Sequence, residues 1–403
     1  MRKNNNNRRQ GRVYAVRGSK EPMVGWSSGR VVSDAKFWRW GDDNLLPNAL
    51  ALMSRRSTTH RRIINDKADY ISGKGFSFDQ GQETLGRFTE RANGRGETLR
   101  QVMNKLAFDK ALFGNAFLEV MTDEAHTFLS LHHQDASRCR VAKEGAGIIL
   151  HHDWARFKPS EAQVLPLYPD FTVCGDGLLR SIIHYKDYEP MFENYGVPRY
   201  LPALGAATIA YKADRWNISR LDNAFQPSGV MVLDGEVDSE HEAAEIARMA
   251  ERRFAGKPGQ VMFMVKNGIE GDATKFVPIS SASDGDWRHL HDQSTSDIIV
   301  AHSWFRTLSG MDYSTGFSPE RVQYEYNIAL GTLISVEQQD ILEPICLAIE
   351  DILGLDTSSL QFVNRPPFEQ KPPYMKVWEA RKADGYDYDP EDDRQGMYLS
   401  ELA

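Results

Sequence analysis

Apolar and polar positions recur at helical spacing over several stretches of the chain. Residues 47–71 place apolar side chains beside arginines and stop at Gly73 and Gly75, so we predict one long amphipathic helix there. A second helix is predicted over residues 99–112, ending at Gly114. The arginines of the first helix have two interpretations, a contact with nucleic acid or a solvated face, and the solvated face is the more common.

Short runs typical of β-strands follow the second helix. A strand is predicted at residues 116–121, and β-rich runs separated by Pro and Gly come after it. These runs lie at residues 147–151, 162–167, 178–188 and 206–211. Helices mixed with short strands predict an α+β fold with a mixed α/β body.

Residues 228–278 have a compact pattern of their own. A strand is predicted over residues 229–233, and a second strand over residues 261–265. Between them, Ser239 and Glu242 have the spacing of a capping box, which opens a helix. The order strand, helix, strand predicts an inserted module.

Two further helices are predicted after the module, with a polar interruption at residues 306–318. Ser318 as the cap and Pro319 at the first helical position begin the second of these helices. Its predicted apolar stripe is Val322, Tyr326, Ala329, Leu333 and Val336. Pro344 is expected to end or kink this helix, because proline lacks the backbone N–H that the helix needs.

Length and charge limit the possible classes of protein. A chain of 403 residues is larger than one hydrophobic core normally supports, so two or three coupled subdomains are expected. The net charge of -8 argues against a general DNA-coating role, which needs an excess of Lys and Arg. The charge is uneven, because residues 1–36 form a basic arm and residues 356–403 an acidic tail. No apolar run reaches the roughly 20 residues that cross a bilayer, and no secretory signal is expected, so we predict a cytosolic protein.

Catalytic and metal-binding motifs are weak in this chain. Cys139, Cys174 and Cys346 are far apart and contain no CxxC pair, which argues against a disulfide framework and a zinc ribbon. Residues 25–29 match GxSxG, but they lack the flanking strand and helix that a serine hydrolase needs. No GxxxxGK[ST] motif occurs, so we predict no ATP hydrolysis by the chain itself.

Two histidine pairs were considered as metal ligands. His132 and His133, or His151 and His152, would need help from Cys139 or Asp153. Neighbouring residues of a strand point to opposite faces, so one histidine of each pair would miss the ion. The sequence therefore predicts no metal and no cofactor.

Several strings, taken in order, resemble a known family. They are WRWGDDNLLPNAL at residues 38–50, FDKALFGNAFLEV at residues 108–120, DNAFQPSGVMVLDGE at residues 222–236, the stretch from DWRHLHD to FRTLSGM at residues 286–311, and YNIALGTLIS at residues 326–335. In this order the chain resembles the portal proteins of long-tailed bacteriophages. It departs from them at residues 304–307, where family members often read Gly-Val-Pro-Pro, so the start of the following loop stays open.

The resemblance implies a portal fold, with a mixed α/β wing, a helical stem, a small strand-helix-strand clip and a C-terminal helical region. The implied parts are a flexible basic arm (1–36), a wing of a first helix plus an α/β body (37–213), a first stem helix (214–227), a clip module (228–278), a second stem helix (279–305), a tunnel loop (306–318), a long helix with a crown-like region (319–355) and an acidic tail (356–403).

The implied function is mechanical rather than enzymatic. A portal forms a dodecameric ring at the capsid vertex, through which double-stranded DNA is packaged and later ejected. The implied partners are further copies of the chain, the large terminase subunit, the major capsid or scaffold protein, neck and tail adaptor proteins, and the DNA in the channel, but no membrane. The implied location is the virion, and the host cytoplasm during assembly.

The resemblance also indicates two sets of site residues. The tunnel loop that faces DNA would include Leu308, Gly310, Met311, Asp312, Tyr313, Gly316 and Phe317. The clip surface that docks the terminase would include Pro227, Ser228, Gly229, Glu242, Lys257 and Asn267. An ordinary connection between two helices remains the alternative for the loop.

Two other functions remain open from the sequence. One is another head or neck connector or a minor capsid protein, which would share the acidity and the lack of catalytic motifs. The other is a nuclease that uses Asp42, Asp43 or Asp312 with a divalent metal.

Overall fold

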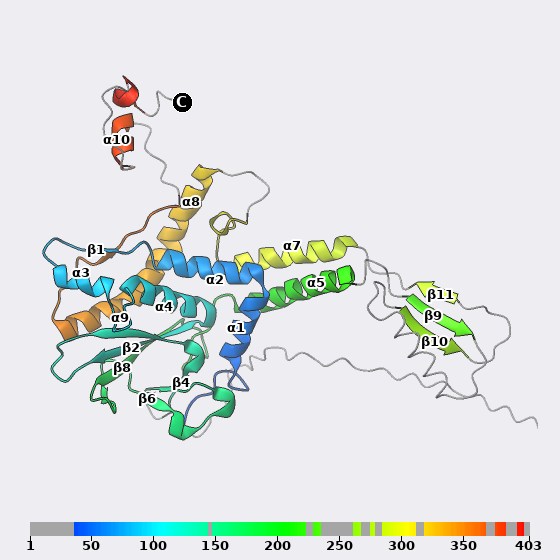
Figure 1. The fold of residues 1–403 in the computed structure, drawn as a ribbon, viewed down its shortest axis with the longest axis horizontal. Helices are drawn as coiled ribbons and strands as arrows, with labels where there is room; N and C mark the ends of the chain where they lie inside the picture. The colour runs from blue at the N-terminus through cyan, green and yellow to red at the C-terminus, as the bar shows by residue number, and fades with distance from the viewer. Residues whose placement is uncertain are drawn as a thin grey trace, which may run out of the picture.

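The computed structural model describes residues 36–143, 147–222, 229–234, 261–266, 275–278, 284–311, 318–367, 375–383 and 393–398. Figure 1 shows an α/β body from which two long helices, α5 (Leu204–Asp222) and α7 (Asp284–Ala301), extend toward a small three-stranded sheet. None of the helices in these ranges is both long enough and apolar enough to span a bilayer.

The first helical region consists of two helices, α1 (Leu46–Arg56) and α2 (Thr58–Ile71), so the prediction of one continuous helix is wrong. Ser57 separates them with an extended backbone, and its side chain accepts a hydrogen bond from the backbone N–H of His60. A serine cap satisfies an N–H group that would otherwise lack a partner at the start of α2. The chain therefore turns at Ser57 although the apolar spacing continues past it.

The helix predicted over residues 99–112 is confirmed as α4 (Leu99–Phe113). It begins with a capping box between Thr98 and Gln101 and ends at Gly114 with a left-handed backbone. A Cβ atom on Gly114 would lie 2.5 Å from the backbone of Val197, so both the conformation and the space require glycine. The helix α3 (Glu83–Glu90) packs beside α4.

The described body contains two larger sheets and a short antiparallel pair, β1 (Phe76–Ser77) with β12 (Gln361–Phe362). The larger has the order β3 (Ser130–Gln134), β2 (Asn115–Thr122), β8 (Leu179–Lys186) and β7 (Thr172–Val173), all antiparallel. The smaller contains β4 (Cys139–Val141), β5 (Ile148–Leu150) and β6 (Gln163–Leu165). Four predicted strands, at residues 116–121, 147–151, 162–167 and 178–188, are therefore confirmed with shifted ends.

The two faces of β2 belong to different parts of the core. Ala116, Leu118 and Val120 are buried in the cluster that contains α4 and α9 (Ser335–Leu353). Phe117 points the other way and is buried with residues of the smaller sheet. The larger sheet thus lies between helices on one face and the smaller sheet on the other.

The strand predicted at residues 206–211 is wrong, because these residues lie inside α5. Ala207, Ala210 and Ala213 are buried at intervals of three, which is the spacing of one helix face. A short apolar run does not distinguish a strand from a buried helix by its pattern alone.

The three-stranded sheet has the order β10 (Val261–Lys266), β9 (Gly229–Asp234), β11 (Lys275–Pro278). Strands β9 and β10 confirm the two predicted strands and pair in parallel, whereas β11 pairs antiparallel to β9 and was not predicted. The helix predicted from Ser239 lies outside the described residues. Parallel pairing of successive strands requires a long crossover, which the intervening chain is long enough to provide.

The last long helix begins as predicted, because Ser318 accepts a hydrogen bond from the backbone N–H of Arg321 at the start of α8 (Pro319–Ala329). A short π-helix, η6 (Leu330–Ile334), joins α8 to α9. The π-turn inserts an extra residue and rotates the buried face. Val322, Tyr326 and Ala329 are buried as predicted, but Ile334 replaces Leu333 in the buried row, and Val336 is 47% exposed, so the end of the predicted stripe is wrong.

Helix α9 continues through Pro344 to Leu353, so of the two predicted effects of this proline, an end or a kink, the end is wrong. A proline inside a helix costs about 3 kcal/mol. On either side of it, Ile341 and Ile345 are completely buried. Each buried side chain of this kind stabilises the fold by about 2 kcal/mol, so packing against the sheet outweighs the cost.

Candidate functional site

Side-chain contacts attach the C-terminal end of α7 to α2. Lys67 of α2 donates a hydrogen bond from Nζ to the backbone oxygen of His302, with 2.6 Å between the two atoms. His60, also on α2, places Nδ1 at 2.8 Å from Nε2 of His302. The ring of Tyr200 packs against both histidines, with ring centroids 4.3 Å from His60 and 4.9 Å from His302. Side chains of α2, together with the ring of Tyr200, therefore hold the junction between α7 and the body.

The turn after α7 is attached to the same helix. Ser309, in the 3-10 turn η5 (Thr307–Ser309), donates from Oγ to Oδ2 of Asp66 at 2.5 Å and accepts the indole N–H of Trp304 at 3.0 Å. Leu308 is buried at 5% exposure. Burial raises the pKa of Asp66 above its ordinary range, and the hydrogen bond from Ser309 opposes this shift. The chain is thus fixed up to Gly310, which ends η5 with a left-handed backbone.

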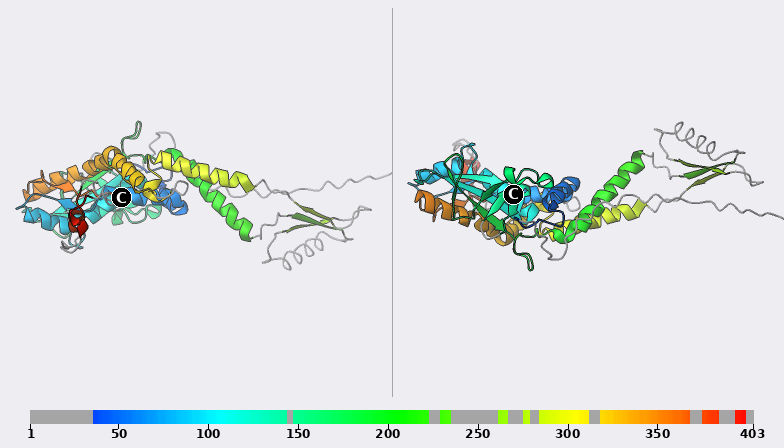
Figure 2. Two further views of the ribbon diagram at one scale, coloured as in Figure 1. Left: turned by 90° about the horizontal axis from the view of Figure 1, so that it is seen from above. Right: turned by 90° about the horizontal axis from the view of Figure 1, so that it is seen from below.

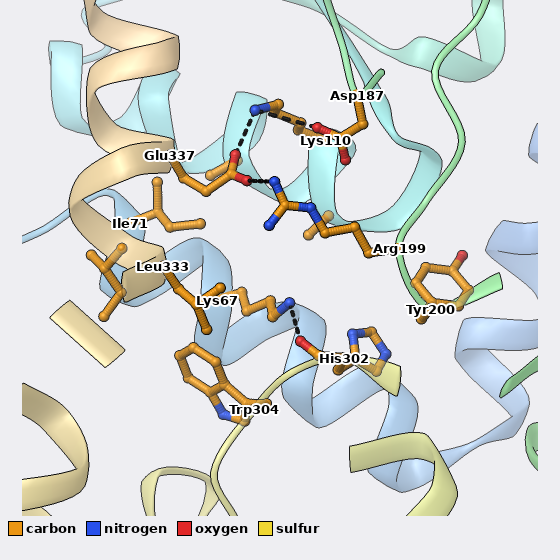
Figure 3. Close-up of a pocket in the computed structure, with 13 residues that line it drawn as sticks. Lys67, Ile71, Lys110, Asp187, Arg199, Tyr200, His302, Trp304, Leu333 and Glu337 are labelled. Atoms are coloured by element: carbon orange, nitrogen blue, oxygen red, sulfur yellow. Dashed lines mark hydrogen bonds and ion pairs between the residues drawn. The ribbon is translucent and has the colours of Figure 1, made fainter. Parts of the chain in front are cut away.

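A cavity of about 40 Å³ lies beside this junction, among α2, α4, α9 and the segment that precedes α5. Figure 3 shows charged side chains from these elements converging on it. Nζ of Lys110 lies 2.5 Å from a carboxylate oxygen of Glu337 and 3.4 Å from one of Asp187. The other oxygen of Glu337 lies 2.9 Å from the guanidinium of Arg199. A volume of this size has room for ordered water but not for an organic cofactor.

Lys110 is the centre of this network. Its side chain is 7% exposed and also lies 3.4 Å from a carboxylate oxygen of Asp340. Burial alone would lower the pKa of Lys110. The nearby carboxylates, of which Glu337 has the larger effect and Asp187 the next, outweigh burial and raise this pKa. The lysine is therefore charged at neutral pH and balances carboxylates from the loop after β8 and from α9.

Lys67 lines the same cavity but has different surroundings. Burial, followed by the charge of Arg199, lowers the pKa of Lys67 to about 8. Its ammonium group also lies 5.9 Å from the ring centroid of Trp304. Lys67 thus links the cavity to the segment that follows α7.

Acidification is expected to weaken the junction. Burial, and then the charge of Arg61, lowers the pKa of His60 to about 4, and burial with the charge of Lys67 places the pKa of His302 well below its usual range. Between pH 6.5 and 4 the unfolded chain binds a proton at His60 that the native chain does not, so stability falls as the pH falls. We expect His60 alone to contribute a loss of about 2 kcal/mol between pH 7 and pH 5.

Urea unfolding at several pH values measures this effect. His60→Asn should remove most of that loss, because the variant carries no titrating ring at this position. His289→Ala, on an exposed position of α7, is the control and should keep the wild-type pH dependence. An unchanged pH slope in His60→Asn would contradict the assignment.

The structure places three of the predicted tunnel-loop residues. Leu308 packs into the body, Gly310 ends η5, and Met311 is partly buried against the core. Asp312, Tyr313, Gly316 and Phe317 lie outside the described residues. Among the predicted clip residues, Gly229 begins β9, and Pro227, Ser228, Glu242, Lys257 and Asn267 lie outside the described residues.

Sequence reasoning missed the residues that hold the junction together, among them His60, Asp66, Lys67, Lys110 and Glu337. The sequence contains one indication that Lys110 takes part in a buried network. Asp109 and Lys110 are adjacent charged residues within an otherwise apolar run at the end of α4, and both are buried. Charged residues are almost never fully buried without partners, so this pair predicts a buried ionic network without identifying the partners.

The prediction that His151 and His152 point to opposite faces of a strand is wrong. Strand β5 ends at Leu150, so His151 and His152 are not strand neighbours, and their rings stack with centroids 4.7 Å apart. With Glu161 they form the one group of metal-ligand spacing found among the described residues. Cys139 is buried, and its thiol donates to the backbone oxygen of Asp135.

The candidate nuclease carboxylates do not form such a group within the described ranges. Asp43 is exposed and accepts a hydrogen bond from the backbone N–H of Leu45 just before α1. Asp42 is exposed, and Asp312 lies outside the described residues.

No protein-family model matches the chain. Over 219 residues the chain is 20% identical to a probable portal protein of Escherichia phage P2, which covers 54% of this chain and 59% of that protein. The chain is similar to a phage portal protein. It spans about three fifths of that portal protein's length.

Two chains from gene transfer agent particles share the fold. One belongs to the virion of a native gene transfer agent particle, with a TM-score of 0.53, 16% identity, and coverage of 84% of this chain and 93% of that chain. Another belongs to the neck of a native gene transfer agent particle computed with C12 symmetry, with a TM-score of 0.51, 16% identity, and coverage of 84% and 94%. This shared fold confirms the α+β class predicted from the sequence, and the portal resemblance agrees with the match to the phage P2 protein.

Proposed function

We propose that the chain is a subunit of a phage portal ring, through which double-stranded DNA enters and leaves the capsid. One observation supports this most directly. Two long helices, α5 and α7, join the α/β body to a small separate sheet, and Figure 2 shows them diverging toward that sheet. The same fold occurs in a neck chain with twelvefold symmetry.

The proposed role is mechanical, and a separate terminase ATPase would supply the energy of translocation. The cavity at the junction supports this, because its charges are paired with each other instead of facing a substrate-sized space. Beside this network, the contacts of Lys67 and His60 with His302 fix the end of α7 relative to the body. A rigid junction of this kind suits a subunit that keeps its shape while DNA moves past it.

We assign the body to the wing, α5 and α7 to the stem, and the sheet of β9, β10 and β11 to the clip. Helix α5 begins at Leu204, so the proposed stem starts ten residues, about three helical turns, before the predicted boundary at residue 214. The terminase and the neck proteins are proposed to dock on the clip. The segment between η5 and α8 is proposed to face the channel, since it joins a turn that is anchored to the body with the cap of α8 at Ser318.

Native mass measurement tests the ring. The purified full chain is expected to give a complex of twelve subunits, each of 45.7 kDa, as the symmetry of the neck chain suggests. Negative-stain images of the same sample should show rings with a central channel. A monomer at every salt and protein concentration would rule out the proposal.

A short connector is the alternative within the same particle. The described chain has a body, a pair of long helices and a separate sheet, which is more than a short connector provides. Images of rings without a channel wide enough for duplex DNA would favour that alternative.

A further inference from the structure

The connection between β5 and β6 brings two histidines and a glutamate to one point. Leu150 of β5 pairs with Gln163 of β6 in an antiparallel register. His151 and His152 directly follow β5, and Glu161 comes two residues before β6 begins. The register alone therefore places these three side chains at the same end of the smaller sheet.

The distances within this group suit a shared ion better than direct hydrogen bonds. Oε2 of Glu161 lies 4.0 Å from Nε2 of His151 and 3.7 Å from Nε2 of His152, too far for hydrogen bonds. Zinc binds nitrogen and carboxylate oxygen at about 2.0–2.2 Å, so two ligands of one tetrahedral ion lie about 3.3–3.5 Å apart. All three ligand atoms lie within 4.8 Å of one another, so movements of about 1 Å would bring them to one ion.

The glutamate has an oxygen available for such an ion. Its Oε1 accepts a hydrogen bond from Nζ of Lys158 at 2.8 Å, which leaves Oε2 facing the two histidines. The lysine thus orients the carboxylate for binding through one oxygen. Partners that orient a ligand in this way commonly surround metal sites.

The buried histidine also has an available nitrogen. Two backbone N–H groups approach the ring of His151, that of Asp153 at 3.1 Å from Nδ1 and that of Lys158 at 3.3 Å from Nε2. A neutral imidazole accepts at only one nitrogen, so one of these contacts is not a hydrogen bond. Nε2 has the longer contact, so an ion beside Glu161 would displace the N–H of Lys158 there. The proton would then lie on Nδ1, and the ring would turn away from the N–H of Asp153.

We propose that His151, His152 and Glu161 bind a divalent transition-metal ion, with water in the fourth position. Two imidazoles and one carboxylate oxygen suit zinc and its neighbours better than magnesium or calcium, which prefer oxygen ligands. The site goes beyond the proposed portal function, because it lies in the smaller sheet and not at the junction with the long helices.

The ion would stabilise the connection between β5 and β6, against which Phe37 packs. Trp154 and Phe157, within the same connection, stack on each other with ring centroids 5.0 Å apart. Phe37 packs edge-on against both of these rings. An ion that joins the two ends of the connection would hold this aromatic cluster in place and raise the melting temperature of the protein.

Titration of the full, untagged chain with Zn²⁺ tests the site. We expect one ion per chain, a higher melting temperature with zinc, and the visible absorption of a tetrahedral site when Co²⁺ is used instead. His152→Ala and Glu161→Gln change partly exposed side chains, at 63% and 38% exposure, so both variants should fold. Loss of an orienting partner alone costs about 10–100-fold in metal affinity, so loss of a ligand should weaken zinc binding about 100-fold or more.

Two matched variants exclude general binding by surface histidines and carboxylates. His289→Ala and Glu124→Gln change exposed residues elsewhere and should bind zinc as the wild type does. Wild-type affinity in His152→Ala and Glu161→Gln, or no zinc binding by the wild-type chain, would overturn the proposal.

Discussion

Replacing Lys110 with methionine is expected to lower the free energy of unfolding by about 3–5 kcal/mol. The side chain of Lys110 is 7% exposed, and its ammonium group lies within 4 Å of Asp187, Glu337 and Asp340. Methionine fills a similar volume but leaves these carboxylates without their shared cation. Removal of one partner from a buried ionic group is costly because the remaining charges stay buried and uncompensated.

The urea midpoint, at one fixed protein concentration because oligomers are stabilised by mass action, measures this loss. Lys105→Met is the matched control on the same helix. Lys105 pairs with Glu97 at the surface, and its side chain is 45% exposed, so the loss there should be below about 1 kcal/mol. Equal midpoints for the two variants would show that the network at Lys110 contributes little to stability.

Replacing residues 312–317 with a shorter glycine linker is expected to leave the rings intact while reducing, severalfold or more, the DNA that is packaged and retained. This prediction depends on the proposed function. The change spares Leu308 and Ser309, which hold the preceding turn to the body, and Ser318, which caps α8. Ring formation should therefore survive, and only the part of the loop beyond the anchored turn is altered.

The measurement is the amount of full-length genome in particles assembled with the variant, next to the native mass of the variant ring. Glycine replacement of residues 124–126, in the exposed connection between β2 and β3, is the control and should leave packaging unchanged. Wild-type packaging and retention with the shortened segment would show that it only connects two helices.

Local sequence signals predicted much of the secondary structure correctly. The glycine at position 114 and the cap at Ser318 both act within a few residues, so they can be read from neighbouring positions. The order of helices and strands likewise predicted the α+β class and the resemblance to portal proteins, which the comparison with the phage P2 protein supports. These features depend on contacts that are close in sequence.

The secondary-structure predictions were wrong where the burial of side chains outweighs the local spacing of apolar residues. Residues 206–211 have the composition of a strand but form part of α5, because one face of that helix packs on the body. Helix α9 continues through Pro344, because the side chains around that proline fill the core. The π-turn before α9 rotates the buried face in a way that a regular helical period does not predict.

The sequence by itself determined the fold class and most of the secondary structure, because both follow from the order and spacing of neighbouring residues. Its strings also carried the resemblance to portal proteins. Only the tertiary structure decided which side chains hold the junction and which form the candidate metal site. Lys110 meets Glu337 across 227 positions of the chain, and His60 meets His302 across 242. Such pairs form only when folding removes both groups from water. A buried polar group without a partner destabilises the fold, so the two groups are found together in the native structure.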